Sequence, residues 1–277
     1  MEMKEIYSQV EKLLSAKSES TRRHYLTGIK AFGLDEKPTL ASVTQAIADW
    51  QKQEVKPNTI KSRMVSLKYV LRMFPREFEE YTQIMQFADM NSFDTKVEVN
   101  APTQEQAEEV IRNSDSRTAL AIGLMYYCGL KVSDVVNLKT ADIKADKITV
   151  QRGNEVRELP MNDRLKQLYS RYYNFDRKNT ILSWIKNHDT DYVLVGKRGR
   201  LSIRSIERCV ADVCRECNFP EWHCHSFRHG LGVKLANAGV NLATIQAVLG
   251  HKNITTTQVY MPLKTDNLND AIKKAFE

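Results

Sequence analysis

Residues 91–102 divide this chain of 277 residues, because they show neither a helical nor a strand period and end at Pro102. Before them, apolar residues recur at helical spacing. Directly after them, Thr103 and Gln106 have the spacing of a capping box that opens a new helix. A chain of this length can bury two cores. We therefore predict a helical first domain over residues 1–92, a linker over 93–102 and a second domain over 103–277.

The first domain is predicted to consist of helices alone. The expected helices are Lys4–Ala16, a segment capped by Ser20 and ending near Gly33, Leu40–Gln53, and a segment between Pro57 and Pro75. In the last of these, an apolar stripe at helical spacing is typical of a core-facing surface. The second and fourth helices also carry basic residues, which either contact a nucleic-acid backbone or are merely solvated. These residues are Arg22, Arg23, Lys30, Lys61, Arg63 and Lys68.

The second domain is predicted to be mostly helical with a small antiparallel β-sheet. A long apolar helix runs from about Arg117 to Cys128 and is closed by Gly129. A hairpin is expected from Lys147–Gln151 and Val156–Pro160, with a turn between them, and a further strand over Tyr192–Val195. After Ser202 the pattern is helical again. The fold class is therefore mainly α (α+β).

Composition favours an anionic partner. The net charge is +7, with 15 Lys+Arg against 14 Asp+Glu in residues 1–100 and 26 against 20 in the remainder. Most of the excess charge therefore lies in the second part. No apolar run approaches the roughly 18 residues of a membrane span, and the charged N-terminus lacks the pattern of a signal peptide. Five cysteines do not form a disulfide framework, so we expect a cytoplasmic protein.

The C-terminal part carries four chemically informative side chains at defined spacings. They occur in His225-Ser-Phe-Arg228, Leu249-Gly250-His251 and the run that ends at Tyr260. A guanidinium and two imidazoles suit the oxyanion of a phosphate, and a neighbouring phenol can act as a covalent nucleophile. This set of residues is the one expected for cutting DNA through a phosphotyrosine link.

With these motifs, residues from about Thr103 onward resemble the catalytic domain of the tyrosine recombinases, the family of phage integrases and chromosome-dimer resolvases. Further matching stretches are Tyr127-Cys-Gly-Leu-Lys131-Val-Ser-Asp134, the Arg152 hairpin, and Ala238-Gly-Val-Asn-Leu-Ala-Thr-Ile-Gln-Ala-Val-Leu-Gly-His251. Less specifically, the first part is similar to the family's core-binding domain. The resemblance implies site-specific recombination or integration of double-stranded DNA, by a virus, mobile element or chromosome, without ATP, metal or cofactor. It also implies a tetramer on DNA, held by the tail after Tyr260.

The resemblance assigns a role to each matching residue. Tyr260 becomes the nucleophile that forms a 3′-phosphotyrosyl bond, and Arg228 holds a non-bridging phosphate oxygen with two parallel N–H bonds. His251 and His225 donate to the developing charge or take part in proton transfer. Asp134 either orients neighbouring basic groups or is simply a carboxylate at a helix start. His223 and His229 lie beside the motif without matching it, and we predict structural roles for both.

Two positions depart from the family pattern. Lys131 stands where the family has its first arginine, and Arg152 stands where it has the hairpin lysine. A guanidinium with a pKa above about 12 is a poor proton donor for the leaving 5′-oxygen. One hypothesis is that Lys131 and Arg152 have exchanged roles. A second is that Lys144 or Lys147 supplies the acid, and a third is that the enzyme is slow or inactive.

Other readings of the chain also remain open. One alternative is a DNA-binding relative without strand transfer, such as a regulatory factor, and the other is a relaxing enzyme similar to type IB topoisomerases. Cys214 and Cys217 have the spacing of zinc ligands, but Cys209 and Cys217 follow a helix pattern that is typical of buried cysteines. We therefore predict that no metal is bound.

Overall fold

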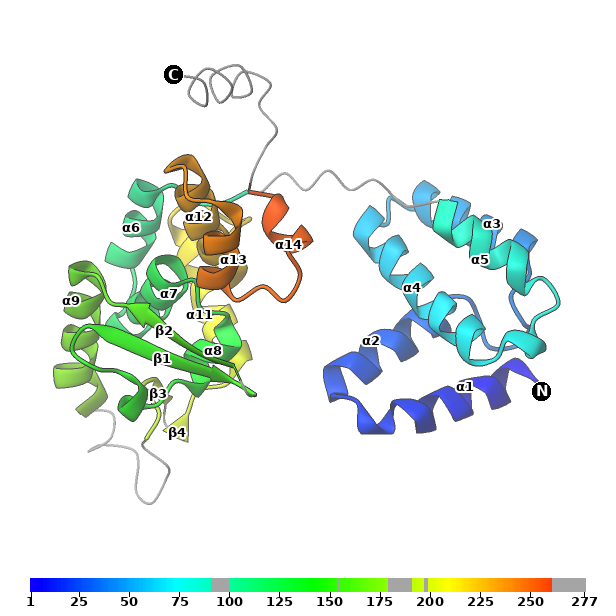
Figure 1. Cartoon of the computed structure of the whole chain (residues 1–277), viewed down its shortest axis with the longest axis horizontal. Coiled ribbons are helices and arrows are strands. Elements are labelled where there is room, and N and C mark those ends of the chain that lie inside the picture. The colour runs from blue at the N-terminus through cyan, green and yellow to red at the C-terminus, as the bar shows by residue number, and fades with distance from the viewer. Residues whose placement is uncertain (91–99, 154, 179–190, 197–198, 261–277) are drawn as a thin grey trace, which may run out of the picture. The chain divides into compact units, whose positions relative to one another are not determined.

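The computed structural model describes residues 1–90, 100–153, 155–178, 191–196 and 199–260 (Figure 1). The chain divides into two compact units, Met1–Lys96 and Val97–Glu277. The predicted linker over 93–102 lies mostly outside the described residues, so the domain bounds derived from the sequence stay a prediction. None of the helices in the described ranges is long and apolar enough to cross a membrane.

Within the described residues of the first unit, all regular secondary structure is helical. Its α-helices are α1 (Met3–Leu13), α2 (Glu19–Lys30), α3 (Leu40–Lys52), α4 (Pro57–Met73) and α5 (Tyr81–Met90), with short 3₁₀ turns at Leu14–Ala16 and Pro75–Glu77. The expected cap of α2 is wrong by two residues. The hydroxyl of Ser18, rather than that of Ser20, accepts the N–H of Thr21 at 3.2 Å. The sequence analysis did not identify α5.

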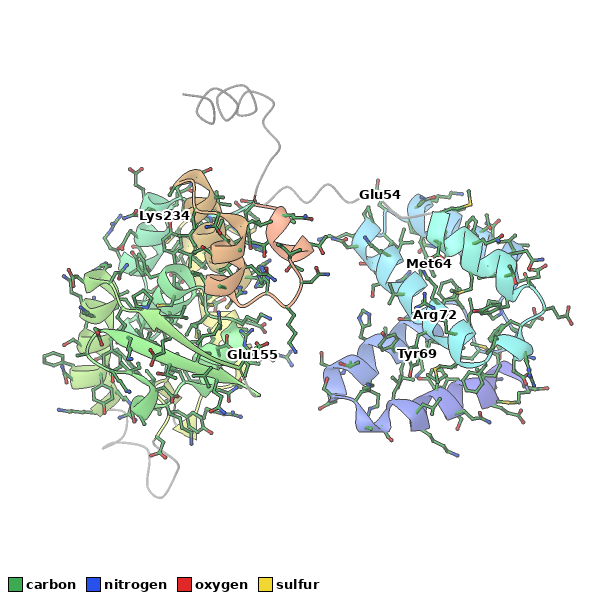
Figure 2. The ribbon with its side chains drawn as sticks, viewed as in Figure 1. Glu54, Met64, Tyr69, Arg72, Glu155 and Lys234 are labelled. Carbon is green, nitrogen blue, oxygen red and sulfur yellow. The ribbon has the colours of Figure 1, made fainter. Side chains whose placement is uncertain are left out.

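The core of the first unit depends on close packing of α2 against α4. Gly28 allows this approach, because a Cβ built at that position would lie 2.2 Å from Oγ of Ser66. On α4, Met64 is buried and Tyr69 packs against Tyr25 with ring centroids 4.6 Å apart (Figure 2). The apolar stripe predicted on this helix therefore does face a core.

The second unit is built around α7, a helix that is apolar on all sides. Its helices are α6 (Gln104–Arg112), α7 (Ser116–Cys128), α8 (Val132–Asn137), α9 (Asp163–Arg171), α11 (Ile203–Glu216), α12 (Cys224–Asn237), α13 (Leu242–Leu249) and α14 (Thr255–Gln258), with a 3₁₀ turn at Thr140–Asp142 and a π-helix at Tyr172–Arg177. α7 packs against α6, α8, α9, α11 and α12 (Figure 1). A helix without a polar face must be enclosed in this way.

An antiparallel hairpin of β1 (Lys147–Arg152) and β2 (Glu155–Pro160) covers one side of this unit. Its register pairs Lys147 with Pro160 and Arg152 with Glu155, so Arg152 stands beside the turn. A second pair of short strands is formed by β3 (Val195–Gly196) and β4 (Gly199–Arg200). The mainly α fold with small antiparallel sheets is confirmed.

The strand predicted over Tyr192–Val195 is largely wrong. Only Val195 belongs to β3, and Tyr192 makes an isolated bridge to Lys139. Val193 and Leu194 are fully buried, and the N–H of Val193 donates to the carbonyl of Leu138 at 2.8 Å. The apolar run at this position therefore indicates that these residues are buried in the core, and it does not indicate regular strand pairing.

Candidate active site

Arg228 lies at the centre of the site, on α12, and its side chain is completely buried. One terminal nitrogen donates to the carbonyl of Gly129 and the other to the carbonyl of Leu249 at 2.5 Å. Burial lowers the pKa of Arg228 to about 10, and the neighbouring Tyr260 opposes this shift. Within the described ranges, its Nε–H meets no acceptor. A buried donor in this state is uncommon, and it is available to an acceptor that enters the site.

Two helix ends create this environment for Arg228. Gly129 caps α7 and Gly250 caps α13, and both adopt the left-handed backbone conformation that ends a helix, with φ of 62° and 61°. The carbonyl oxygens at such an end are unpaired within the helix and carry partial negative charge. The carbonyls of Gly129 and Leu249 can therefore hold a buried cation without a carboxylate.

Tyr260 follows α14 and is only 3% exposed. Its ring packs against Gly232 of α12, where a Cβ would lie 2.6 Å from the ring carbon that carries the hydroxyl. The hydroxyl is 2.5 Å from Nδ1 of His229. Burial raises the pKa of Tyr260 to about 12, although the nearby Arg228 acts in the opposite direction. The resting phenol is therefore protonated.

The two histidines predicted for catalysis surround this centre. His251 follows Gly250, and its ring lies 6.4 Å from the ring of Tyr260 at an interplanar angle of 17°. Its Nδ1 is 2.9 Å from Oγ1 of Thr257, which fixes the plane of the ring. Burial, then Arg228 and Lys131, lowers the pKa of His251 to about 4. At neutral pH this imidazole is therefore uncharged.

His225 is more exposed and lies on the same helix as Arg228. Its ring centroid is 4.5 Å from that of His229, and burial followed by the charge of Arg228 lowers its pKa. His223, for which we predicted a structural role, caps the helix: its Nδ1 accepts the N–H of His225 at 3.2 Å. The hydroxyl of Tyr260, however, is bonded to His229, a residue that the family motif did not select.

The two positions that depart from the family pattern meet at Asp134. Arg152 donates to both carboxylate oxygens of Asp134, with its Nε at 2.9 Å from Oδ1. The backbone N–H of Lys131 donates to the same carboxylate at 3.0 Å, so Asp134 both caps α8 and orients a basic group. Lys131 lines a cavity of about 710 Å³ together with His223 and His225. Burial, then Arg152 and Arg228, lowers the pKa of Lys131.

The other lysines considered as acids lie elsewhere. Lys147 stands at the far end of β1 from Arg152, about 16 Å away at the rise of a strand. Its ammonium group forms an ion pair with Glu158 at 2.8 Å. Lys144 precedes this strand and is exposed. Of the three candidate lysines, only Lys131 therefore lies beside the histidines of the site.

Residues 101–266 match the family model described as the phage integrase family. The chain belongs to the phage integrase family. The match covers the whole constellation from Lys131 to Tyr260. The family membership that the sequence motifs predicted is confirmed.

Several curated relatives share this integrase region. The chain is 31% identical to the tyrosine recombinase XerC of Chromohalobacter salexigens over 162 residues, which cover 57% of the chain and 52% of that protein. A tyrosine recombinase of Thermosipho africanus is 23% identical over 91% of the chain and 94% of its own length. The chain thus spans about half the length of the first of the curated relatives that it matches.

Solved structures of integrases share the fold. The Tn1549 transposon integrase in complex with transposon right end DNA superposes with a TM-score of 0.80 at 18% identity, covering all of both chains. A lambda integrase dimer bound to a core site superposes with a TM-score of 0.71 at 18% identity, covering 94% of this chain and 95% of that one. At this level of identity, the likeness is one of fold.

Arg157, which no sequence motif singled out, supports the same site. This residue lies on β2, and its guanidinium donates to the carbonyl of Val248 at 2.7 Å, at the end of α13. A Cβ on Gly250 would lie 2.6 Å from this guanidinium, so only glycine lets it approach so closely. Arg157 therefore holds the helix end that positions both Leu249 and His251.

We expect Arg157→Ala to lower the free energy of unfolding of the second unit by about 1–3 kcal/mol, because buried carbonyls lose a charged donor. Urea denaturation of the full chain, followed by hydrogen exchange of peptides from this unit, measures the change. Arg215→Ala is the matched control, since Arg215 lies in the last turn of α11 but is exposed and pairs with Asp212. We expect the control to change stability by less than about 0.5 kcal/mol. Equal effects of the two substitutions would contradict the anchoring role.

The basic residues predicted to bind DNA all lie in the first unit, on α2 and α4. Arg23 pairs with Glu19 and Lys68 with Asp89, so their charges are partly neutralised. Arg63 lies over the ring of Trp50 at 4.4 Å and Lys30 over the ring of Tyr7 at 5.3 Å. Arg22 and Lys61 are exposed. Their role in DNA binding stays a prediction.

Three cysteines on or near α11 are packed in the core, whereas Cys209, which the helix pattern also predicted to be buried, is only partly buried. Cys214 is completely buried and Cys217 and Cys224 are nearly so, and burial raises the pKa of each thiol. In the part of the chain that the structure describes, no group of three or more His, Cys, Asp or Glu is arranged to hold a metal ion. A buried thiol with a raised pKa is a weak metal ligand, because binding requires the thiolate.

Proposed function

We propose that this chain is a site-specific DNA recombinase that cuts and rejoins DNA through a 3′-phosphotyrosyl intermediate. The observation that carries the proposal is the buried guanidinium of Arg228, whose Nε–H lacks an acceptor among the described residues, close to the phenol of Tyr260. A phosphate oxygen supplies the acceptor and the negative charge that this cation lacks. The proposed phosphate-binding site around Arg228 therefore also contains a nucleophile, the phenol of Tyr260.

In the proposed reaction, the phenolic oxygen of Tyr260 attacks phosphorus while Arg228 and His251 donate to the non-bridging oxygens. The 5′-oxygen leaves and needs a proton. We assign this proton to Lys131, because Lys131 lines the cavity beside His225 while the guanidinium of Arg152 is held by Asp134. The phosphotyrosyl ester conserves the energy of the broken bond, so rejoining requires neither ATP nor a metal ion.

The proposed substrate is double-stranded DNA. The net charge of +7 supports this choice, and so do the related integrase structures, which contain bound DNA. We propose assembly as a tetramer on two DNA sites, in the cytoplasm. The tail predicted to hold the tetramer lies outside the described residues. The predicted phosphate contacts of the first unit, on α2 and α4, belong to the same proposal.

The test begins with a pull-down of genomic fragments by the full chain, followed by reaction of plasmids that carry two copies of the enriched site. We expect recombined products in the presence of EDTA and without ATP. Relaxation of plasmids that lack the site would favour an enzyme similar to type IB topoisomerases. Tight binding to the site without any strand cleavage would show an inactive, regulatory relative and overturn the proposal.

A further inference from the structure

His229 lies next to the phenolic hydroxyl of Tyr260, where a general base would be needed for the attack on phosphorus. Its Nδ1 is 2.5 Å from the phenolic oxygen, and it is on α12, one residue after Arg228 and one helical turn after His225. Neither His225 nor His251 makes a hydrogen bond to this hydroxyl among the described residues. The nucleophile is therefore connected to a histidine outside the set that the family motif provides.

The direction of this hydrogen bond follows from burial. Tyr260 is 3% exposed, and in the described ranges its hydroxyl has no other hydrogen-bond partner than Nδ1 of His229. A buried O–H must donate to an acceptor. If Nδ1 carried the hydrogen, the phenolic proton would have no acceptor. His229 is therefore the tautomer with its hydrogen on Nε2, and its Nδ1 lone pair faces the phenol.

We propose that His229 is the general base that removes the proton of Tyr260 during DNA cleavage, an inference that rests on the recombinase function proposed above. As the bond from the phenolic oxygen to phosphorus forms, the phenolic proton moves to Nδ1 of His229. The bond from phosphorus to the 5′-oxygen breaks, and that oxygen keeps the electron pair and receives a proton from Lys131. In rejoining, His229 returns its proton to the phenolic oxygen.

The surroundings of His229 explain why the proton moves only when DNA is bound. Burial, then the charges of His225 and Arg228, with smaller effects of His223 and His251, lowers its pKa to about 4. The pKa of Tyr260 is about 12, so at rest the proton stays on oxygen by a wide margin. A phosphate bound at Arg228 offsets the positive charge that depresses the imidazole pKa, and bonding to phosphorus makes the phenol more acidic.

The experiment compares His229→Ala and His229→Asn in single-turnover cleavage of a nicked suicide substrate that carries the enriched site. Asparagine can place an acceptor oxygen near the position of Nδ1 but cannot take up a proton at neutral pH. We expect both variants to cleave about 10²- to 10⁴-fold more slowly than the wild type. Cleavage by His229→Asn within about threefold of the wild type would reduce His229 to a positioning residue. If His229→Ala cleaved at the wild-type rate, His229 would have no role in cleavage.

A second substrate distinguishes loss of the general base from damage to the groups that bind the phosphate. DNA with a 3′-p-nitrophenyl phosphate can be joined to a 5′-hydroxyl without a protein nucleophile, because nitrophenolate leaves without a proton. The comparison is made in Tyr260→Ala, which frees space for the nitrophenyl ring. We expect His229→Ala in this background to leave the joining rate within about threefold. A parallel loss of joining would show damage to the phosphate site and overturn the inference. If the wild type forms no adduct at all, the proposed function fails instead.

Discussion

Tyr260→Phe is expected to abolish the covalent protein–DNA adduct while leaving DNA affinity within about twofold. Phenylalanine keeps the ring that packs against Gly232 but has no oxygen to attack phosphorus. The lost hydrogen bond to His229 should change stability by about 0.5–1.5 kcal/mol, too little to unfold the unit. Adduct formation is measured on the suicide substrate by denaturing electrophoresis, and affinity is measured by a binding titration at fixed salt.

Tyr126→Phe is the matched control for this substitution. Tyr126 is 1% exposed and lies on α7 of the same unit, so it tests the loss of a buried phenolic oxygen that, among the described residues, makes no hydrogen bond to His229. We expect this variant to form adduct at a rate within about threefold of the wild type. Adduct formation by Tyr260→Phe would mean that another residue is the nucleophile.

Lys131→Ala is expected to slow cleavage of ordinary DNA by about 10²- to 10⁴-fold and to recover when the scissile 5′-oxygen is replaced by sulfur. A thiol has a pKa of about 8.5, so a thiolate leaves without receiving a proton. The ammonium group of Lys131 has a pKa that burial lowers, which makes it a better donor than an ordinary lysine. Single-turnover rates on the oxygen and sulfur substrates measure the effect.

Two further variants identify which property of Lys131 matters. Lys131→Arg keeps the charge but removes the acid, so we expect slow cleavage of the oxygen substrate and recovery with sulfur. Arg152→Ala removes the partner of Asp134 and should slow both substrates alike. Failure of the sulfur substrate to rescue Lys131→Ala would end the assignment of Lys131 as acid. If the sulfur substrate rescued Arg152→Ala but not Lys131→Ala, Arg152 would be assigned as the general acid instead.

The site around Arg228 contains a buried cation before any substrate is bound. Arg228 is buried between two helix ends whose carbonyls of Gly129 and Leu249 stabilise it only in part, as its lowered pKa shows. An anion that enters this site gains the attraction of a cation that is poorly solvated by water. Electrostatic stabilisation of this kind requires little reorganisation during the reaction.

Much of the fold follows from local patterns in the sequence. The stripe on α4, the apolar α7 closed by Gly129 and the β1–β2 hairpin each depend on neighbouring residues, whose spacing indicates the element. The grouping of Arg228, His251 and Tyr260 could be predicted because the motifs that carry them resemble those of the family. The cap of α2 could not be placed as reliably, since Ser18 and Ser20 both precede the helical pattern.

The contacts that the sequence did not reveal link distant segments. Tyr260 reaches His229 across 31 residues, and Arg157 reaches Val248 across 91, so no period connects either pair. The nearest signal for His229 is its place one helical turn after His225, which puts both on one face of α12. The absence of a side chain at Gly232 on the same helix was a further signal, because it leaves room for a ring.

The most direct test of the account is the identification of the atom that carries the DNA. Adduct trapped on the suicide substrate is digested with protease, and the peptide attached to the DNA is identified by mass spectrometry, while end labels report which side of the break is joined. We predict a peptide in which the oxygen of Tyr260 bears the 3′-phosphate, with a free 5′-hydroxyl on the other side. A different linked residue, or a 5′-phosphate linkage, would contradict the account.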